Sequence, residues 1–236
     1  MAGVILALDV GTADEAEKLL DTIPGLRWVK IGSVLATREG GALARRLVAR
    51  GLCVFLDLKW HDIPNTVAGA VAQARDMGVA MATVHTLGGR RMMEAAAAAA
   101  GDELRLVGVT VLTSHDAAGY ADAVGRERVD LVAEASRLAT IAGDSGLSGV
   151  VCSPAEVATM RAILPADALV VVPGIRRSGD RTGDQQRVAT PAAATAAGAS
   201  YLVVGRPVLE AADAAAAFEA ICREAAGAGP AGVALG

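Results

Sequence analysis

Aromatic residues, cysteines and long apolar runs are all scarce in this chain of 236 residues, and each scarcity excludes a class of protein. Aromatic residues make up 3% of the chain and hydrophobic residues 53%, so we expect a core of Ala, Val, Leu and Ile. No apolar stretch reaches the roughly 18 to 20 residues that span a bilayer, so no membrane partner is expected. The apolar N-terminus has no basic region before it and meets Asp9 too soon for a secretory signal.

Cysteines and clusters of positive charge are also few. Cys53, Cys152 and Cys222 are too widely spaced for a disulfide framework or a metal site, so we expect a protein of the reducing cytoplasm. The net charge is −4, and Lys and Arg form no cluster. No nucleic acid or anionic membrane is therefore expected as a partner, and a few placed groups must hold any anionic ligand.

Short apolar runs alternate with stretches of helical periodicity along the chain. The runs expected as strands are residues 4–8, 28–31, 52–56, 79–84, 106–110, 149–152, 169–172 and 201–204. The expected helices are residues 13–20, 41–50, 66–77, 90–100, 129–142, 154–164, 190–197 and 208–224. Eight such units in about 225 residues predict a single-domain α/β protein, a (β/α)8 TIM barrel.

The barrel is expected to occupy residues 1–224, and a flexible Gly/Ala-rich tail is expected at residues 225–236. A doubly wound open sheet is the alternative fold. That alternative is disfavoured because no Gly-x-Gly-x-x-Gly follows the first strand.

A segment with the sequence Asp-Leu-Lys-Trp-His-Asp begins at Asp57, where an apolar strand ends. Side chains alternate along a strand, so Asp57 and Lys59 project to the same side if the strand continues past Asp57. Asp62 lies further on and requires a turn, which the segment around Pro64 can supply. A solvated loop in which Asp62 or Asn65 caps the next helix is the alternative interpretation.

Charges of alternating sign occupy the ends of the first three expected strands. Asp9 ends the first strand, the second carries Lys30, and the third delivers Asp57 and Lys59. The C-terminal strand ends of a barrel carry its chemistry, and neighbouring opposite charges offset the cost of burial. A purely structural ion-pair network is the alternative. His85, at the end of the fourth strand, is expected to order a hydrogen-bond network rather than to transfer a proton.

The ends of the last four expected strands carry residues typical of ligand contacts. They are Thr110, Thr113, Ser153, Pro173, Gly174, Arg176, Gly205 and Arg206. The loops after strands 7 and 8 are the usual phosphate site of such barrels, and Arg206 follows Gly205 at a helix start. The polar, glycine-rich segment 177–184 is expected to close over the anion, with a charged surface loop as the alternative.

Together these motifs resemble the orotidine 5'-monophosphate decarboxylase family, in its bacterial form, over nearly the whole chain. The most specific part is residues 55–66, whose Asp57, Lys59 and Asp62 resemble the Asp-x-Lys-x-x-Asp signature of the family. Supporting segments, in the family's order, are residues 7–9, 29–30, 109–113, 173–176, 183–185 and 205–207. The resemblance implies decarboxylation of orotidine 5'-monophosphate to uridine 5'-monophosphate and CO2 in de novo pyrimidine biosynthesis, without metal or cofactor.

The resemblance also implies a substrate-binding set. Its members are Asp9, Lys30, Asp62, Ile63, Thr66, Thr113, Pro173, Arg176, Gln185, Gly205 and Arg206. The resemblance implies that Asp9 and Lys30 contact the ribose hydroxyls and that Thr113 faces the pyrimidine. It also implies that the 5'-phosphate is held by Arg176, Gln185, Gly205 and Arg206. The residues matching Asp62 and Thr66 come from the partner subunit, which implies a homodimer with shared sites.

The implied catalytic residues are Lys59, Asp57, Lys30 and Asp62. Loss of CO2 from the 6-position leaves negative charge on an in-plane ring carbon, which must be stabilised electrostatically. The ammonium group of Lys59 suits that task and can then protonate the carbon as a general acid. Asp57 would lie near the departing carboxylate and orient Lys59.

Two other functions remain open at this stage. A metal-dependent sugar-phosphate decarboxylase or aldolase has a similar signature, but it carries a metal-binding carboxylate where this chain has Lys30, which would repel the metal. A non-catalytic nucleotide-phosphate binding barrel would need the phosphate groups but not Lys59.

Overall fold

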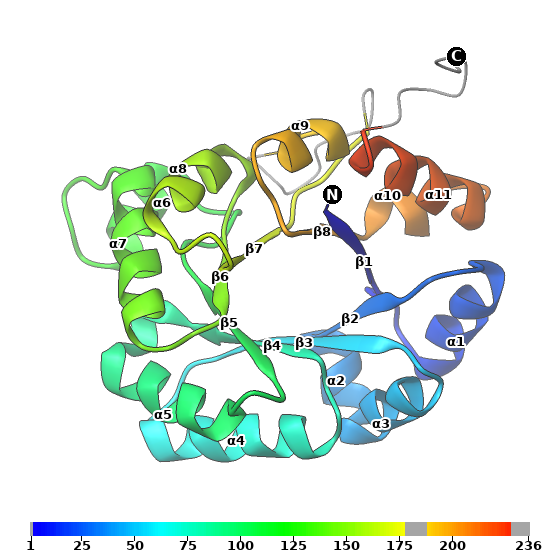
Figure 1. The fold of residues 1–236 in the computed structure, drawn as a ribbon, viewed down its shortest axis with the longest axis horizontal. Coiled ribbons are helices and arrows are strands. Elements are labelled where there is room, and N and C mark those ends of the chain that lie inside the picture. Colours follow the sequence, from blue (N-terminus) through cyan, green and yellow to red (C-terminus); the bar gives the residue numbers. More distant parts are fainter. Residues whose placement is uncertain (1, 178–187, 228–236) are drawn as a thin grey trace.

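The computed structural model describes residues 2–177 and 188–227, and its centre is a closed barrel of eight parallel strands in sequential order. Figure 1 looks down the barrel, with the strands in a ring and the helices outside it. The strands are β1 (Gly3–Ala7), β2 (Trp28–Gly32), β3 (Cys53–Trp60), β4 (Met81–His85), β5 (Arg105–Val109), β6 (Gly149–Val151), β7 (Leu169–Val172) and β8 (Tyr201–Val204). The predicted (β/α)8 barrel is confirmed.

The helices surround this ring and follow the strands in alternation. They are α1 (Ala13–Thr22), α2 (Ser33–Glu39), α3 (Gly41–Ala49), α4 (Pro64–Asp76), α5 (Arg90–Ala100), α6 (Ala117–Ala123), α7 (Leu131–Asp144), α8 (Val157–Ile163), α9 (Pro191–Ala196), α10 (Arg206–Leu209) and α11 (Ala214–Ala225), with 3-10 turns η1 (Thr86–Gly88) and η2 (Pro154–Glu156). The short helices α2 and α6 were not predicted.

The single helix expected at residues 208–224 is wrong, because the structure divides this segment into α10 and α11. Asp213 is the N-cap of α11, and its side chain accepts a hydrogen bond from the backbone N–H of Ala216. A carboxylate that satisfies a free amide at a helix start favours a new helix over continuation of the previous one. The tail predicted at residues 225–236 overlaps α11 at Ala225, and its part beyond residue 227 lies outside the described residues.

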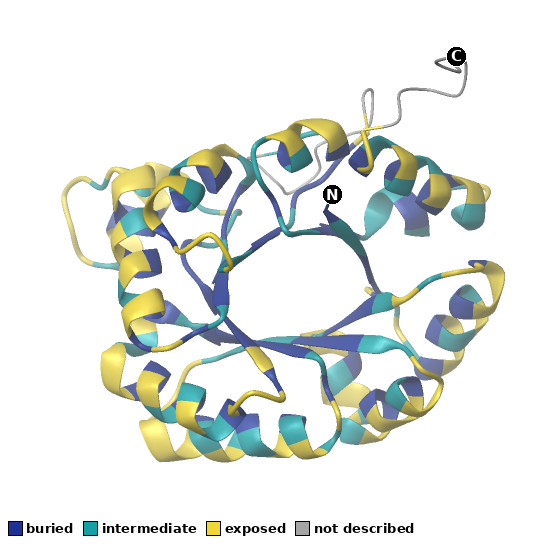
Figure 2. Ribbon diagram, in the orientation of Figure 1, coloured by how far each residue is buried: buried dark blue, intermediate teal, exposed yellow. Residues whose placement is uncertain are grey.

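The strands are buried on both sides, and the alternation of their side chains separates two apolar layers. Outward residues pack against the helices, whose inner faces are buried and outer faces exposed (Figure 2). Inward residues fill the barrel below its mouth: Ile5, Ala7, Phe55, Met81, Val107, Val171 and Val203. By the same alternation, Asp57 continues the inward row above Phe55, and Thr83 continues it above Met81.

Strand β3 extends four residues past the predicted run 52–56, and it carries an irregularity at its C-terminal end. Its register with β4 shifts between Leu56, which pairs with Ala82, and Trp60, which pairs with Val84. Within this shift Lys59 has a φ of 53°, in the left-handed region. Bulges of this kind redirect a side chain, and here the redirected residue is the lysine of the charged signature.

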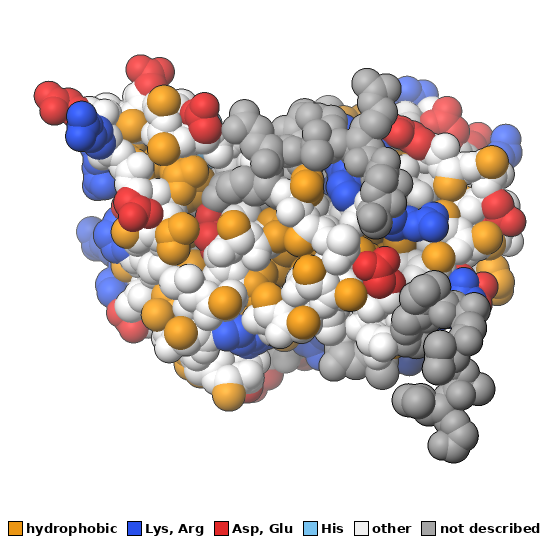
Figure 3. Space-filling model, turned by 90° about the horizontal axis from the view of Figure 1, so that it is seen from above, with side chains coloured by type: hydrophobic (Ala, Val, Ile, Leu, Met, Phe, Trp, Pro, Cys, Tyr) orange, Lys and Arg blue, Asp and Glu red, His pale blue; other side chains and the backbone are white. Residues whose placement is uncertain are grey.

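Composition led to two expectations, that no segment spans a membrane and that basic residues form no cluster. No helix within residues 2–177 and 188–227 is long and apolar enough to cross a bilayer. On the face drawn in Figure 3, acidic and basic side chains of the described residues are interspersed among small apolar ones.

Candidate active site

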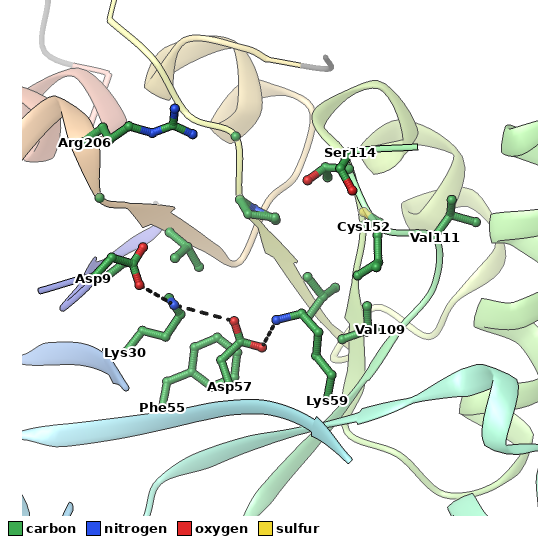
Figure 4. Close-up of a pocket in the computed structure, with 18 of the residues that line it drawn as sticks. Asp9, Lys30, Phe55, Asp57, Lys59, Val109, Val111, Ser114, Cys152 and Arg206 are labelled. Atoms are coloured by element: carbon green, nitrogen blue, oxygen red, sulfur yellow. Dashed lines mark hydrogen bonds and ion pairs between the residues drawn. The ribbon is translucent and has the colours of Figure 1, made fainter. Parts of the chain in front are cut away.

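A cavity of about 340 Å³ opens at the C-terminal ends of the strands (Figure 4). Of the described residues, those that line it come from every βα unit except that of β4. They are Ala7, Asp9, Lys30, Phe55, Asp57, Lys59, Val109, Val111, Leu112, Thr113, Ser114, Val151, Cys152, Pro173, Gly174, Arg176, Val203, Gly205 and Arg206. Ten of the residues expected from the sequence are therefore brought together: Asp9, Lys30, Asp57, Lys59, Thr113, Pro173, Gly174, Arg176, Gly205 and Arg206.

Four of these residues form a chain of alternating charges along one wall of the cavity (Figure 4). The Nζ atom of Lys30 lies 3.0 Å from Oδ1 of Asp9 and 3.7 Å from Oδ2 of Asp57. The Nζ atom of Lys59 lies 2.9 Å from Oδ1 of Asp57. Each ammonium thus has a carboxylate beside it, which reduces the cost of removing these charges from water.

Burial differs along the chain of charges. The side chains of Lys30 and Asp57 are 11% and 15% exposed, whereas that of Lys59 is 37% exposed. Lys59 is therefore the cation of this wall that faces the open cavity. Lys30, which touches both carboxylates, lies behind it and holds the two acids near each other.

Two glycines make room for these charges. A Cβ atom at Gly32 would lie 2.9 Å from Nζ of Lys30, and one at Gly205 would lie 3.3 Å from Oδ2 of Asp9. Real Cβ atoms essentially never approach a heavy atom within 3.0 Å, so a side chain at Gly32 would displace the Lys30 amine. The backbone at both positions lies close to the charged wall because no side chain intervenes.

Two arginines from the ends of β7 and β8 also line the cavity. Arg176 is buried, and its Nη1 donates a hydrogen bond to the carbonyl of Ile175 at 2.8 Å. Arg206 is the first residue of α10, with Gly205 as the N-cap, and Figure 4 shows its guanidinium across the cavity from Lys59. Gln185 and most of the predicted closing segment 177–184 lie outside the described residues.

Asp62, Ile63 and Thr66 are exposed and do not line this cavity in the described part of the chain. Oδ1 of Asp62 accepts a hydrogen bond from the backbone N–H of Ile63 at 2.6 Å. Neither Asp62 nor Asn65 caps the next helix, because the N-cap of α4 is Ile63, without a side-chain hydrogen bond, and Pro64 occupies the first turn. The helix-capping interpretation of these polar residues is therefore wrong.

His85 makes one side-chain hydrogen bond and one ring contact in the described structure. Its Nδ1 accepts a hydrogen bond from the backbone N–H of Leu87 at 3.3 Å, and its ring stacks on His61 at 5.7 Å between centroids. Burial, followed by the charges of His61, Lys59 and His115, lowers the pKa of His85 to about 4. The imidazole is therefore neutral at neutral pH and accepts hydrogen bonds there.

Several lining residues were not predicted from the sequence. Phe55, Val151 and Val203 lie within apolar strands, and only the closure of the barrel shows that their side chains border a cavity. Ser114 lies one position beyond the predicted Thr113, and Cys152 is buried in the core while also bordering the cavity. The inward alternation of each strand is the pattern that could have identified the apolar members of this set.

Comparisons with known proteins show one family over nearly the whole chain. Residues 3–221 match the orotidine 5'-phosphate decarboxylase / HUMPS family. The orotidine 5'-phosphate decarboxylase of Halorhodospira halophila is 53% identical over 232 residues, which are 96% of this chain and 97% of that protein. That of Laribacter hongkongensis is 49% identical, over 94% of this chain and 92% of that protein. The crystal structure of orotidine 5'-phosphate decarboxylase from Lactobacillus acidophilus is similar, with a TM-score of 0.85 and 34% identity over 95% of this chain and 99% of that one.

Proposed function

This chain belongs to the orotidine 5'-phosphate decarboxylase / HUMPS family, and we infer that it is a carboxy-lyase that converts orotidine 5'-monophosphate to uridine 5'-monophosphate and CO2 in pyrimidine biosynthesis. The observation that carries this inference is the Lys59 ammonium, which faces the cavity 2.9 Å from the Asp57 carboxylate. We place this activity in the cytoplasm, where free thiols such as those of the three cysteines persist.

The substrate is proposed to span the cavity from the arginines to the charged wall. Arg176, Arg206 and the backbone amide of Gly205 bind the 5'-phosphate, because guanidinium groups and helix-start amides are suited to phosphate oxygens. Asp9 and Lys30 bind the ribose hydroxyls. Thr113 then faces the pyrimidine, together with Pro173. Gln185 would complete the phosphate site.

Lys59 carries the chemistry in this proposal. When the bond between C6 and the carboxylate breaks, its electron pair remains on C6 and CO2 departs. The Lys59 ammonium stabilises this in-plane charge and then donates a proton to C6, which yields uridine 5'-monophosphate and a neutral amine that takes a proton from water. The reaction requires no redox step and no covalent enzyme–substrate intermediate, so no cofactor is proposed.

Asp57 has two roles in this scheme. It holds the Lys59 amine 2.9 Å away, and it places negative charge beside the carboxylate that is lost. Binding of the remote phosphate and ribose can offset that repulsion, because such binding energy is available to position the reacting group.

A metal-dependent reaction on this barrel is the competing function, and the surroundings of Lys30 disfavour it. Its ammonium lies within 3.7 Å of the carboxylates of both Asp9 and Asp57. A divalent cation between these acids would have to replace that lysine. We therefore propose that the decarboxylation is independent of metal.

The direct test of the proposed function is a spectrophotometric assay in excess chelator. We expect purified protein to convert orotidine 5'-monophosphate to uridine 5'-monophosphate at the same rate with and without EDTA. A strict requirement for a divalent cation would favour the sugar-phosphate reaction instead. No loss of orotidylate absorbance under either condition would favour one of the two rivals, the sugar-phosphate enzyme or a barrel that only binds nucleotides.

Replacing Arg206 with alanine is expected to weaken the binding of uridine 5'-monophosphate by about 10- to 100-fold, since a hydrogen bond to a charged group contributes about 1.5–3 kcal/mol. Binding of uridine, which lacks the phosphate, should change little. Isothermal titration with both ligands measures the two effects. Arg223→Ala, an exposed arginine on α11, is the matched control. Equal losses for nucleotide and nucleoside would contradict the phosphate assignment.

We further propose a homodimer in which Asp62 and Thr66 reach the ribose of the neighbouring subunit. Exposed apolar side chains follow the C-terminal ends of three adjacent strands: Val34 after β2, Ile63 after β3 and Leu87 after β4. A group of exposed apolar residues beside a cavity is typical of a surface that another protein covers. Asp62, Ile63 and Thr66 lie on this same side of the molecule but outside their own cavity.

Mixing two inactive variants tests the shared site. In a hybrid of Lys59→Ala with Asp62→Ala, one site carries both changes and the other carries neither, so activity should return after subunit exchange. A tagged copy of each variant allows the hybrid to be purified and assayed against both parents. If a verified hybrid is as inactive as its parents, each chain supplies its own Asp62 and this part of the proposal is wrong.

A further inference from the structure

Thr83, on β4, contacts two residues of the charged wall, Asp57 and Lys59. Its side chain is fully buried, and it lies in the inward row of β4 above Met81 without lining the cavity. From its contacts we propose that the Thr83 hydroxyl is a positioning group that sets the relative placement of Asp57 and Lys59. This inference rests on the proposed function, because it concerns the residues assigned to decarboxylation.

The Thr83 hydroxyl contacts both members of the pair. The backbone N–H of Lys59 donates to Oγ1 of Thr83 at 2.8 Å. Oγ1 of Thr83 donates in turn to Oδ1 of Asp57 at 3.1 Å. That same oxygen atom of Asp57 accepts the hydrogen bond from Nζ of Lys59 at 2.9 Å. One hydroxyl therefore closes a ring that contains the backbone and the amine of Lys59 and the carboxylate of Asp57.

The chemistry of these groups determines the direction of each hydrogen bond. A backbone N–H only donates and an ionised carboxylate only accepts, whereas a hydroxyl does both. The hydroxyl proton of Thr83 must therefore point to Asp57, and an oxygen lone pair must face the amide of Lys59. Valine has the same shape as threonine and can replace neither interaction.

The backbone of Lys59 explains why such support is needed. Its φ of 53° is the only positive value at a non-glycine residue in the described part of the chain. This conformation is disfavoured for a residue with a side chain and persists only where the surroundings hold it. The register between β3 and β4 is irregular at this point, and the side chain of Thr83 accepts the Lys59 N–H there.

Thr86 provides a matched comparison. It is also a buried threonine beside β4, but its hydroxyl donates to the backbone carbonyl of Val109 at 2.8 Å, as an ordinary structural contact. Removing the hydroxyl of Thr86 and that of Thr83 should reduce stability by similar mechanisms. Only the change at Thr83 removes a contact to the proposed catalytic pair.

The experiment compares Thr83→Val, Thr83→Ser and Thr86→Val with the wild-type protein. We measure kcat for orotidine 5'-monophosphate, the Kd of uridine 5'-monophosphate and the melting temperature. Thr83→Val is expected to lower kcat by about 10²-fold, the effect of misplacing a reacting group by roughly 1 Å. Product affinity should be retained, since the phosphate and ribose groups are unchanged. Thr83→Ser keeps the hydroxyl and should restore kcat, and Thr86→Val should leave kcat unchanged.

The proposal is overturned if Thr83→Val retains the wild-type kcat, if Thr86→Val loses as much activity, or if serine fails to restore it. A crystal structure of Thr83→Val gives a second readout that is independent of the reaction. We expect φ of Lys59 to leave the left-handed region or its amine to leave Asp57, and an unchanged pair would overturn the proposal. Should valine prevent folding, the comparison of Thr83→Ser with Thr83→Ala replaces it. Failure of the wild-type protein to decarboxylate the nucleotide would instead refute the proposed function.

Discussion

Replacing Lys59 with alanine is expected to lower kcat for orotidine 5'-monophosphate by at least about 10⁴-fold, because two contributions are lost together. General acid catalysis by a positioned group and stabilisation of developing charge each contribute about 10²-fold or more. Lys30 cannot replace the missing cation, since its amine is largely buried and held between the carboxylates of Asp9 and Asp57. The variant would also leave Asp57 without the cation that faces the cavity.

The binding of uridine 5'-monophosphate should survive this change, and that contrast makes the prediction specific. The arginines at the ends of β7 and β8 and the Asp9–Lys30 pair are untouched by it. Stopped assays at high enzyme concentration measure the residual turnover, and titration with the product measures its Kd. Lys18→Ala, an exposed lysine on α1, is the matched control and should behave as wild type. Near-normal turnover of Lys59→Ala would refute the assignment of this lysine as the acid.

Replacing Asp57 with asparagine is expected to produce the second large loss, about 10²- to 10³-fold or more in kcat/KM. A carboxylate that pairs with a reacting amine positions that amine, and misplacing a reacting group by roughly 1 Å costs about 10²-fold in rate. Asp57 holds two amines, with Nζ of Lys59 at 2.9 Å and Nζ of Lys30 at 3.7 Å. Asparagine keeps the volume of the side chain and a carbonyl oxygen for the Thr83 hydroxyl, so the loss reports the charge.

The same variant separates positioning from general damage to the fold. Asp144→Asn removes an exposed carboxylate that pairs with Arg90 at 3.2 Å, and it should change neither activity nor the melting temperature noticeably. Asp57→Asn should lose activity even at temperatures well below its melting point. If Asp57→Asn kept wild-type turnover, the charge of Asp57 would be irrelevant to the reaction, and the chain of alternating charges would have a purely structural role.

The elements of the barrel were predictable because their signals are local. Buried parallel strands are short apolar runs, and each of the eight predicted runs overlaps an observed strand. The charged residues at the ends of these strands could be identified for the same reason. A charged residue directly after an apolar run is visible in the local sequence. Helices α2 and α6, each seven residues long, were not predicted, whereas α8 and α9, which are equally short or shorter, lie within predicted helices.

The sequence alone determined which charged groups the barrel mouth contains. Asp9, Lys30, Asp57 and Lys59 could be placed at strand ends from the order of the elements and the alternation of side chains along each strand. Both are local properties of the sequence. Only the tertiary structure decided how these groups meet. The closed barrel brings Asp9 next to the amine of Lys30. Where the register of β3 and β4 shifts, the backbone N–H of Lys59 donates a hydrogen bond to the Thr83 hydroxyl. Such distances depend on pairing between strands far apart in sequence, which no local pattern of residues contains.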